Sequence, residues 1–98
     1  MVKINTLNYT NHAQKRINQR GIPYSVVNFI LSYGECIDTY DLTKHFINNN
    51  ALKYLKEEYP SFISKHEKQL KNTAVVYGNN AVVTVMKITK KIRREYAF

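Results

Sequence analysis

Apolar residues at helical spacing mark the first element of the chain. Ala13 and Ile17 lie four residues apart and therefore share one face of a helix. Thr10 in front of them is a suitable N-cap, and Gly21 behind them is a typical helix end. The pattern predicts a helix that runs from Thr10 to about Arg20.

A second helix is predicted between Pro23 and Gly34, since proline is favoured in a first helical turn and glycine just past the last one. Its apolar face contains Val26, Val27, Ile30 and Leu31. Residues 24–33 include no charged side chain, so we expect this helix to pack inside the domain. A DNA-binding helix-turn-helix presents polar and basic side chains on its second helix, and the sequence therefore disfavours that class.

Two short strands are predicted within residues 35–47, on either side of Asp41. Asn49 or Asn50 is expected to cap a third helix, which Pro60 interrupts or restarts. The apolar positions of that helix are Leu52, Leu55, Tyr59 and Phe62.

The last third of the chain holds the clearest strand signal. Residues 61–71 are helical in pattern but polar, and the valine-rich runs 73–77 and 81–88 follow them. Gly-Asn-Asn joins these two runs, as is typical of a tight hairpin turn. Residues 2–7 alternate weakly and could form one more short strand.

A chain of 98 residues suffices for one hydrophobic core, so residues 1–98 are expected to form a single domain with a basic tail over about 89–98. The elements predict an α+β fold in which helices come first and pack on a small antiparallel sheet. No apolar run approaches the roughly 18 residues of a membrane span, and no signal peptide is recognisable. Cys36 is the one cysteine, which excludes an internal disulfide, fits a cytoplasmic protein and, in its apolar context, predicts a buried side chain.

Charge and composition point to an anionic partner. Fifteen Lys and Arg residues against seven Asp and Glu give a formal net charge of +8, which favours nucleic acid first and acidic protein second. The possible soft metal ligands, His12, His45, His66 and Cys36, do not occur at the spacing of zinc sites. Glycine-rich phosphate loops are absent too, so we expect neither a metal nor another cofactor.

His12, Arg16 and Arg20 recur every four residues beside the apolar stripe of the first helix, over a length of about 12 Å. Imidazole can accept and release a proton near neutral pH, and arginine binds phosphate through paired N–H groups. Cleavage of RNA without a metal requires such groups, because the 2′-hydroxyl loses a proton, the leaving 5′-oxygen gains one, and the phosphorane dianion needs fixed positive charge. The same spacing also occurs on helix faces that are merely solvated.

These residues are part of a longer pattern. His-Ala-Gln-Lys-Arg at 12–16, Gln-Arg-Gly-Ile at 19–22 and Tyr-Gly-Glu at 33–35 resemble an uncharacterised bacterial and phage domain family that opens with His-Ala-x-x-Arg-x-x-x-Arg-Gly-Ile. The later blocks that fit the family are 51–55, 73–76 and 82–85, so the resemblance spans roughly residues 9 to 88. The family is grouped with RelE-like toxins and the wider barnase, EndoU and colicin nuclease fold. The resemblance implies a RelE-like fold, metal-independent RNA cleavage, and an acidic antitoxin protein as a partner.

In toxins of this fold, a helical His, an Arg, and a Thr or Ser on a late strand carry the activity. The resemblance therefore implies His12 as the acid or base, Arg16 or Arg20 as the phosphate clamp, and Thr84 as a hydroxyl that positions the phosphate. Threonine is also simply a good strand residue, and Thr84 can be structural.

The chain departs from the toxin pattern at Met86, where a Tyr would be expected two residues after the Thr. Tyr40 or Tyr77 could replace that Tyr, or the chain cleaves RNA poorly or not at all. The substrate-binding candidates are Tyr40, Lys44, Lys87, Lys90 and Arg93. The basic run at 87–94 can neutralise phosphates or can be a solvated tail.

Two functions therefore remain open from the sequence. The first is a small endoribonuclease toxin that cuts RNA to a 2′,3′-cyclic phosphate. The second is a catalytically inactive module of the same fold that binds RNA or protein.

Overall fold

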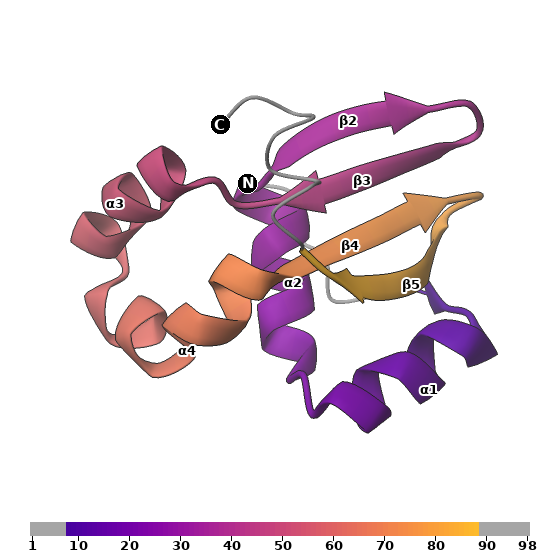
Figure 1. Cartoon of the computed structure of the whole chain (residues 1–98), viewed down its shortest axis with the longest axis horizontal. Helices are drawn as coiled ribbons and strands as arrows, with labels where there is room; N and C mark the ends of the chain where they lie inside the picture. Colours follow the sequence, from indigo (N-terminus) through magenta and orange to yellow (C-terminus); the bar gives the residue numbers. More distant parts are fainter. Residues whose placement is uncertain (1–7, 89–98) are drawn as a thin grey trace.

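The computed structural model describes residues 8–88, which form four helices and five strands (Figure 1). In chain order the elements are β1 (Asn8–Tyr9), α1 (Asn11–Arg20), α2 (Tyr24–Tyr33), β2 (Glu35–Thr39), β3 (Leu42–Phe46), α3 (Asn49–Glu58), α4 (Pro60–Asn72), β4 (Thr73–Gly78) and β5 (Ala81–Lys87). The predicted α+β class is confirmed. The segment 2–7 and the basic tail at 89–98 lie outside the described residues.

The five strands form one mixed sheet in the order β1-β5-β4-β3-β2. β1 runs parallel to β5 and pairs Tyr9 with Val82, whereas all other neighbouring strands are antiparallel. The expectation of a purely antiparallel sheet is therefore wrong at this edge. The two strands predicted within residues 35–47 are confirmed as β2 and β3, which precede α3 and α4. The parallel pair satisfies backbone groups at the outer edge of β5 that would otherwise lack protein partners.

Thr10 joins this sheet edge to α1. Its backbone N–H donates to the Val82 carbonyl at 3.0 Å, and its hydroxyl donates to the Val83 carbonyl at 2.9 Å. The same hydroxyl accepts the N–H of Ala13 at 3.1 Å, so the predicted N-cap is confirmed. Gly21 ends the helix with a left-handed backbone (φ 62°), also as predicted.

The cap of α3 differs by one residue from the prediction. Asn48, rather than Asn49 or Asn50, accepts the N–H of Ala51 with its side-chain oxygen at 2.8 Å. The amide group of Asn48 also donates to Glu35 Oε1 at 2.6 Å, which ties the start of α3 to the start of β2. Local sequence could not distinguish three consecutive asparagines, since each can cap a helix equally well.

All four helices contribute to the main hydrophobic core. The predicted anchors of α1, Ala13 and Ile17, are buried, and the uncharged helix α2 packs inside the domain as expected. The described core residues are Ala13, Ile17, Ile22, Val26, Val27, Phe29, Ile30, Ile47, Leu52, Leu55, Ile63, Leu70, Val75, Val82 and Val85. In Figure 1, α1 lies beside β5, whereas α3 and α4 gather on the left-hand side of the molecule.

The sheet has a second apolar face. Successive side chains of a strand point to opposite faces. Val75 and its partner Val85 belong to the main core, whereas the adjacent pair Ala74 and Met86 belongs to a separate cluster. The residues of that second cluster are Ile37, Phe46, Ala74, Met86 and Ile88. Side chains on β5 therefore divide between the face that packs the helices and the face opposite.

Candidate nucleic-acid interface

The basic stripe lies on the exposed side of α1. Ala13 and Ile17 hold the helix on the main core, and the three stripe residues His12, Arg16 and Arg20 are all exposed. An α-helix turns by about 100° per residue, so each fourth residue is displaced by about 40° around the axis. The stripe therefore winds from the outer side of α1 at His12 toward the flank nearest the core at Arg20.

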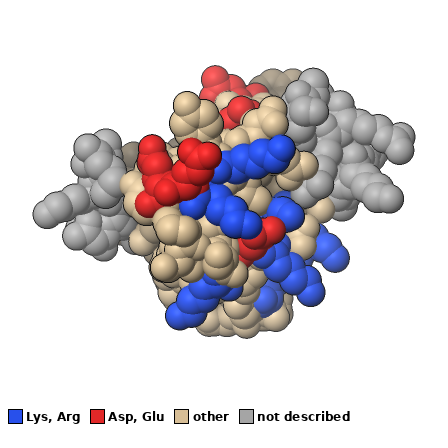
Figure 2. All heavy atoms as spheres, turned by 90° about the vertical axis from the view of Figure 1, so that its left-hand side faces the viewer, with Lys and Arg blue, Asp and Glu red and all other residues tan. Residues whose placement is uncertain are grey.

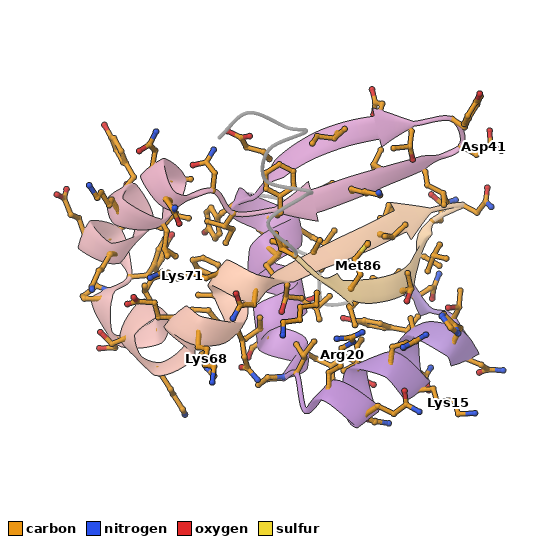
Figure 3. The ribbon with its side chains drawn as sticks, in the orientation of Figure 1. Lys15, Arg20, Asp41, Lys68, Lys71 and Met86 are labelled. Atoms are coloured by element: carbon orange, nitrogen blue, oxygen red, sulfur yellow. The ribbon has the colours of Figure 1, made fainter. Side chains whose placement is uncertain are left out.

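A first hollow lies at the outer side of α1. His12, Lys15, Arg16 and Gln19 line it, and its volume is about 360 Å³. We call it the His12 hollow. None of these four lining residues is acidic, and Figure 3 shows Lys15 on the side of α1 that is turned away from the sheet. The His12 side chain is thus exposed and shares this hollow with two positively charged side chains.

A second hollow of about 350 Å³, which we call the Arg20 hollow, lies where α1, α4 and β5 meet. Its described lining residues are Arg20, Ile22, Lys68, Gln69, Asn72, Thr73, Met86 and Lys87. Three of them carry positive charge, and none of them carries negative charge. Figure 3 shows Arg20 on the side of α1 that faces β5, below Met86, with Lys68 on the neighbouring helix α4.

Two hydrogen bonds fix the walls of the Arg20 hollow. Gln69 on α4 donates from its side-chain amide to the Gly21 carbonyl at 2.9 Å, which holds α4 against the end of α1. The N–H of Ile88 donates to the Asn72 carbonyl at 2.8 Å, which holds the end of β5 against the end of α4. Three cationic side chains are thereby presented from elements whose relative positions are set by direct bonds.

Thr84 and Lys44 lie elsewhere, in one row across the sheet. Val76 pairs with Thr84 on β5 and with Lys44 on β3, and Lys44 pairs in turn with Ile37 on β2. Ile37 belongs to the second apolar cluster, so this row is on the sheet face opposite the main core. Thr84 lines neither of the two hollows as described, and its hydroxyl donates to the Val85 carbonyl at 3.3 Å. The structure thus does not bring Thr84 together with His12.

A bulge explains this position of Thr84. Val76 pairs with Thr84 and Tyr77 pairs with Val82, so Val83 is an extra residue on β5. Strict alternation from Val82 would place Thr84 on the same face as Val82. The extra residue at Val83 shifts the alternation, so Thr84 lies on the opposite face.

The other predicted substrate-binding residues are scattered. Tyr40 is fully exposed at the tip of the β2–β3 hairpin, where its backbone has a positive φ of 34°. Lys87 is exposed at the end of β5 and lines the Arg20 hollow. Lys90 and Arg93 lie outside the described residues. Of these candidates, the structure brings Lys87 together with a residue of the basic stripe.

Met86, which stands where the resemblance predicts a tyrosine, lines the Arg20 hollow. Its thioether cannot donate a hydrogen bond or transfer a proton. Tyr77, considered as a replacement, pairs with Val82 and packs edge-on against His45, so it is on the main-core face of the sheet, away from Thr84. The described lining of the Arg20 hollow therefore offers cationic side chains and no phenol.

His45 and Cys36 are the remaining side chains considered for a chemical role. Burial lowers the pKa of His45 below its usual value, and its ring nitrogen shares a hydrogen bond of 2.8 Å with the Thr43 hydroxyl. Cys36 is exposed, so the expectation of a buried cysteine is wrong. The reason is that β2 is the last strand of the sheet, with no further strand beside it in the described fold. Within residues 8–88, no three His, Cys, Asp or Glu side chains are grouped as metal ligands.

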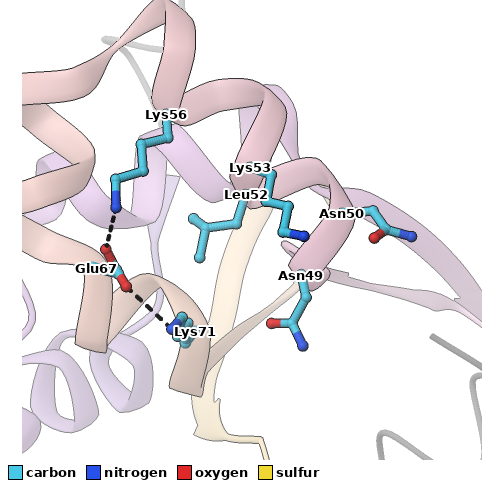
Figure 4. A pocket seen from close by; sticks show the side chains of 7 residues that line it. All are labelled: Asn49, Asn50, Leu52, Lys53, Lys56, Glu67 and Lys71. Carbon is cyan, nitrogen blue, oxygen red and sulfur yellow. Dashed lines mark hydrogen bonds and ion pairs between the residues drawn. The ribbon is translucent and has the colours of Figure 1, made fainter.

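A third hollow, of about 460 Å³, lies between α3 and α4 (Figure 4). Its charges are partly compensated: Glu67 accepts from Lys71 at 3.1 Å and from Lys56 at 3.4 Å. These bonds, that of Lys71 first, lower the pKa of Glu67. Figure 2 shows this side of the molecule, with Lys and Arg side chains lying next to carboxylates. The carboxylate of Glu67 makes this hollow less favourable for a polyanion than the Arg20 hollow, whose described lining residues include no carboxylate.

Sequence reasoning missed Lys68, Gln69 and Asn72, which complete the Arg20 hollow from α4. Their spacing of one and four residues places them on one side of that helix, which was a usable signal. Nothing in the local sequence indicates that this side meets α1 and β5.

The fold and these surfaces define a small α+β domain with a basic, histidine-containing face on its first helix. A family model described as a domain of unknown function (DUF4258) matches residues 9–87, and the chain belongs to this family. Searches among curated proteins and among solved structures found no match. Among the described residues, no helix has the length and apolar character needed to cross a membrane.

Proposed function

We propose that this protein is a metal-independent endoribonuclease of RelE-like fold whose active surface is the stripe of His12, Arg16 and Arg20. The observation that carries the proposal is the His12 hollow, which the exposed His12 lines together with Lys15 and Arg16 and without an acidic lining residue. Such a hollow attracts phosphate and offers it a group that exchanges protons near neutral pH.

The reaction needs few groups. The imidazole of His12 takes the proton of a 2′-hydroxyl, whose oxygen attacks the adjacent phosphorus, and Arg16 stabilises the negative charge that develops there. The bond from phosphorus to the 5′-oxygen then breaks, and that oxygen takes a proton from solvent, to which this face is open. The products are a 2′,3′-cyclic phosphate and a 5′-hydroxyl, and no electron transfer is involved.

Purified protein tests this reaction when it is incubated with single-stranded RNA in excess EDTA. We expect wild type to yield fragments that end in a cyclic phosphate, and His12→Ala to lose at least about 100-fold in rate, as is usual for removal of an acid–base group. His66→Gln is the matched control, because His66 lies on α4 and lines neither the His12 hollow nor the Arg20 hollow. Intact RNA with the wild-type protein over the whole range from acidic to basic pH would rule out the enzyme.

A second function is favoured by two specific observations. Met86 stands where a toxin of this fold would have a tyrosine, and Thr84 lies on the sheet face away from the main core. We therefore keep as the alternative a module that binds RNA through the same stripe without cutting it. It predicts an RNA affinity that falls steeply with salt and largely survives His12→Ala, in a protein that leaves RNA intact.

The toxin role and the acidic antitoxin partner are proposed on the same surface. An acidic segment that covers the stripe would neutralise it and block access of RNA. Induced expression in a bacterial host tests the role: growth arrest with wild type but not with His12→Ala supports a toxin, and normal growth with both contradicts it.

A further inference from the structure

The His12 hollow and the Arg20 hollow are neighbours on one helix. Arg16 lines the first and Arg20 lines the second, and four residues of α-helix separate them by about 6 Å along the axis. Each hollow is basic on its own, and none of the described residues that line either one is acidic. Two cationic sites one helical turn apart suit a ligand that carries regularly spaced phosphates.

We infer that the two hollows are adjacent phosphate subsites for one single-stranded RNA. The phosphate at the His12 hollow is the one that reacts, and the next phosphate along the strand binds in the Arg20 hollow, between Arg20, Lys68 and Lys87. The inference rests on the proposed function for the identity of the ligand. It goes further in assigning Lys68 and Lys87 to substrate binding and in requiring a substrate with more than one phosphate.

The geometry of the Arg20 hollow supports this assignment. Its three cations come from three different elements, α1, α4 and β5, so they surround the space instead of lining one helix face. The bond from Gln69 to the Gly21 carbonyl and the bond from Ile88 to the Asn72 carbonyl hold those elements together. The elements that carry the three cations are therefore in place before a ligand arrives, which lowers the entropic loss on binding.

A single-stranded ligand fits better than a duplex. The subsites follow the axis of one exposed helix, and residues of α1, α4 and β5 line the second subsite, which is open to solvent. The helix α2 buries Val26, Val27, Phe29 and Ile30 and carries no charged residue, so its exposed side offers no cations to a duplex groove. A flexible single strand can follow successive cationic side chains along a helix.

The test compares minimal substrates that differ by one phosphate. Dinucleoside monophosphates of all base combinations carry only the scissile phosphate, and the same compounds with an added terminal 5′- or 3′-phosphate carry a second one. For wild type we expect the added phosphate at one of the two ends to raise kcat/KM about tenfold, the effect of three contacts as strong as exposed ion pairs. The end that gives the gain identifies the direction of the strand.

Variants then localise the gain. We expect it to fall to about twofold in the double variant Lys68→Ala/Lys87→Ala, because only Arg20 remains in the subsite. Lys65→Ala is the matched control, since Lys65 is an exposed lysine of α4 that does not line the Arg20 hollow. An equal gain at both ends, no gain at either end, or a full gain in the double variant would each overturn the inference.

A binding measurement separates this inference from the proposed activity. An oligonucleotide with 2′-O-methyl groups has no attacking hydroxyl, so its affinity can be measured whether or not the protein cleaves RNA. We expect Lys68→Ala and Lys87→Ala each to reduce the slope of log affinity against log salt by about 0.7, and Lys65→Ala to leave it unchanged. Absence of cleavage with this pattern would reject the enzyme and keep the subsite. Identical slopes in all variants would reject the subsite even if wild type cleaves RNA.

Discussion

Replacement of Gly34 by alanine offers a sharp test of the fold that presents the basic stripe. A Cβ atom on Gly34 would lie 2.5 Å from the Ile30 carbonyl oxygen and 2.7 Å from the Phe46 carbonyl oxygen. Both are backbone atoms, one within α2 and one in β3, so the backbone at Gly34 must move by about an ångström from each to reach ordinary contact distance. We expect the free energy of unfolding to drop by about 2–3 kcal/mol and the melting temperature to fall by roughly 10–20 °C.

Gly21→Ala is the matched comparison, because it tests backbone conformation without crowding. A Cβ on Gly21 would meet no atom within 4 Å, but the residue has a φ of 62°. The expected loss is about 1 kcal/mol, the penalty for a left-handed residue with a side chain. Urea unfolding followed by circular dichroism would measure both variants. If Gly34→Ala is as stable as Gly21→Ala, the close approach of α2 and β3 is incorrect.

Three further predictions concern single side chains. Burial lowers the pKa of His45, so the folded state favours the neutral ring and loses stability as the pH falls through and below the usual histidine range. Between about pH 7 and pH 5, the urea midpoint of the wild type should therefore fall more steeply than that of His45→Gln. Parallel curves for the two proteins would refute this. The bonds from Lys71 and Lys56 lower the pKa of Glu67, so its carboxylate contributes stability at neutral pH that is lost in acid. Glu67→Gln should therefore lower the urea midpoint at neutral pH, and more at low salt than at high salt. An unchanged midpoint would contradict the bridge between α3 and α4. Cys36 is exposed, so a disulfide reagent should modify it in the folded protein at a rate within about tenfold of an unfolded control, whereas protection by orders of magnitude would contradict the position of β2.

The helix boundaries of the N-terminal half could be predicted because their causes are local. Thr10 caps α1 with an N–H three residues away, and Gly21 ends it through its own backbone conformation. Gly34 ends α2 as predicted, but the reason it must be glycine is only partly local: a Cβ would meet the Ile30 carbonyl and also the carbonyl of Phe46, twelve positions further along the chain. Short-range patterns identify such residues, and only the packed structure explains them.

The candidate site was less accessible from the sequence because its causes are long-range. His12, Arg16 and Arg20 follow from helical spacing alone, and they lie on one exposed stripe of α1. Lys68 joins Arg20 through the packing of α4 beside α1, which no local pattern indicates. Thr84 was grouped with the stripe by resemblance, but the bulge at Val83 and the strand pairings place it on the sheet face away from the main core.

The attachment of β1 and α1 to β5 has a consequence for protein synthesis. Residues 8–20 leave the ribosome before residues 81–87, the strand with which they pair. Until that strand emerges, the hydroxyl of Thr10 has no β5 carbonyl to bind, and α1, with ten residues, is too short to persist alone in water. The nascent chain therefore lacks the Arg20 hollow, and the surface proposed to bind RNA forms only after translation has passed Lys87. A ribosome that makes this protein is thus not exposed to that surface while most of the domain is still being synthesised.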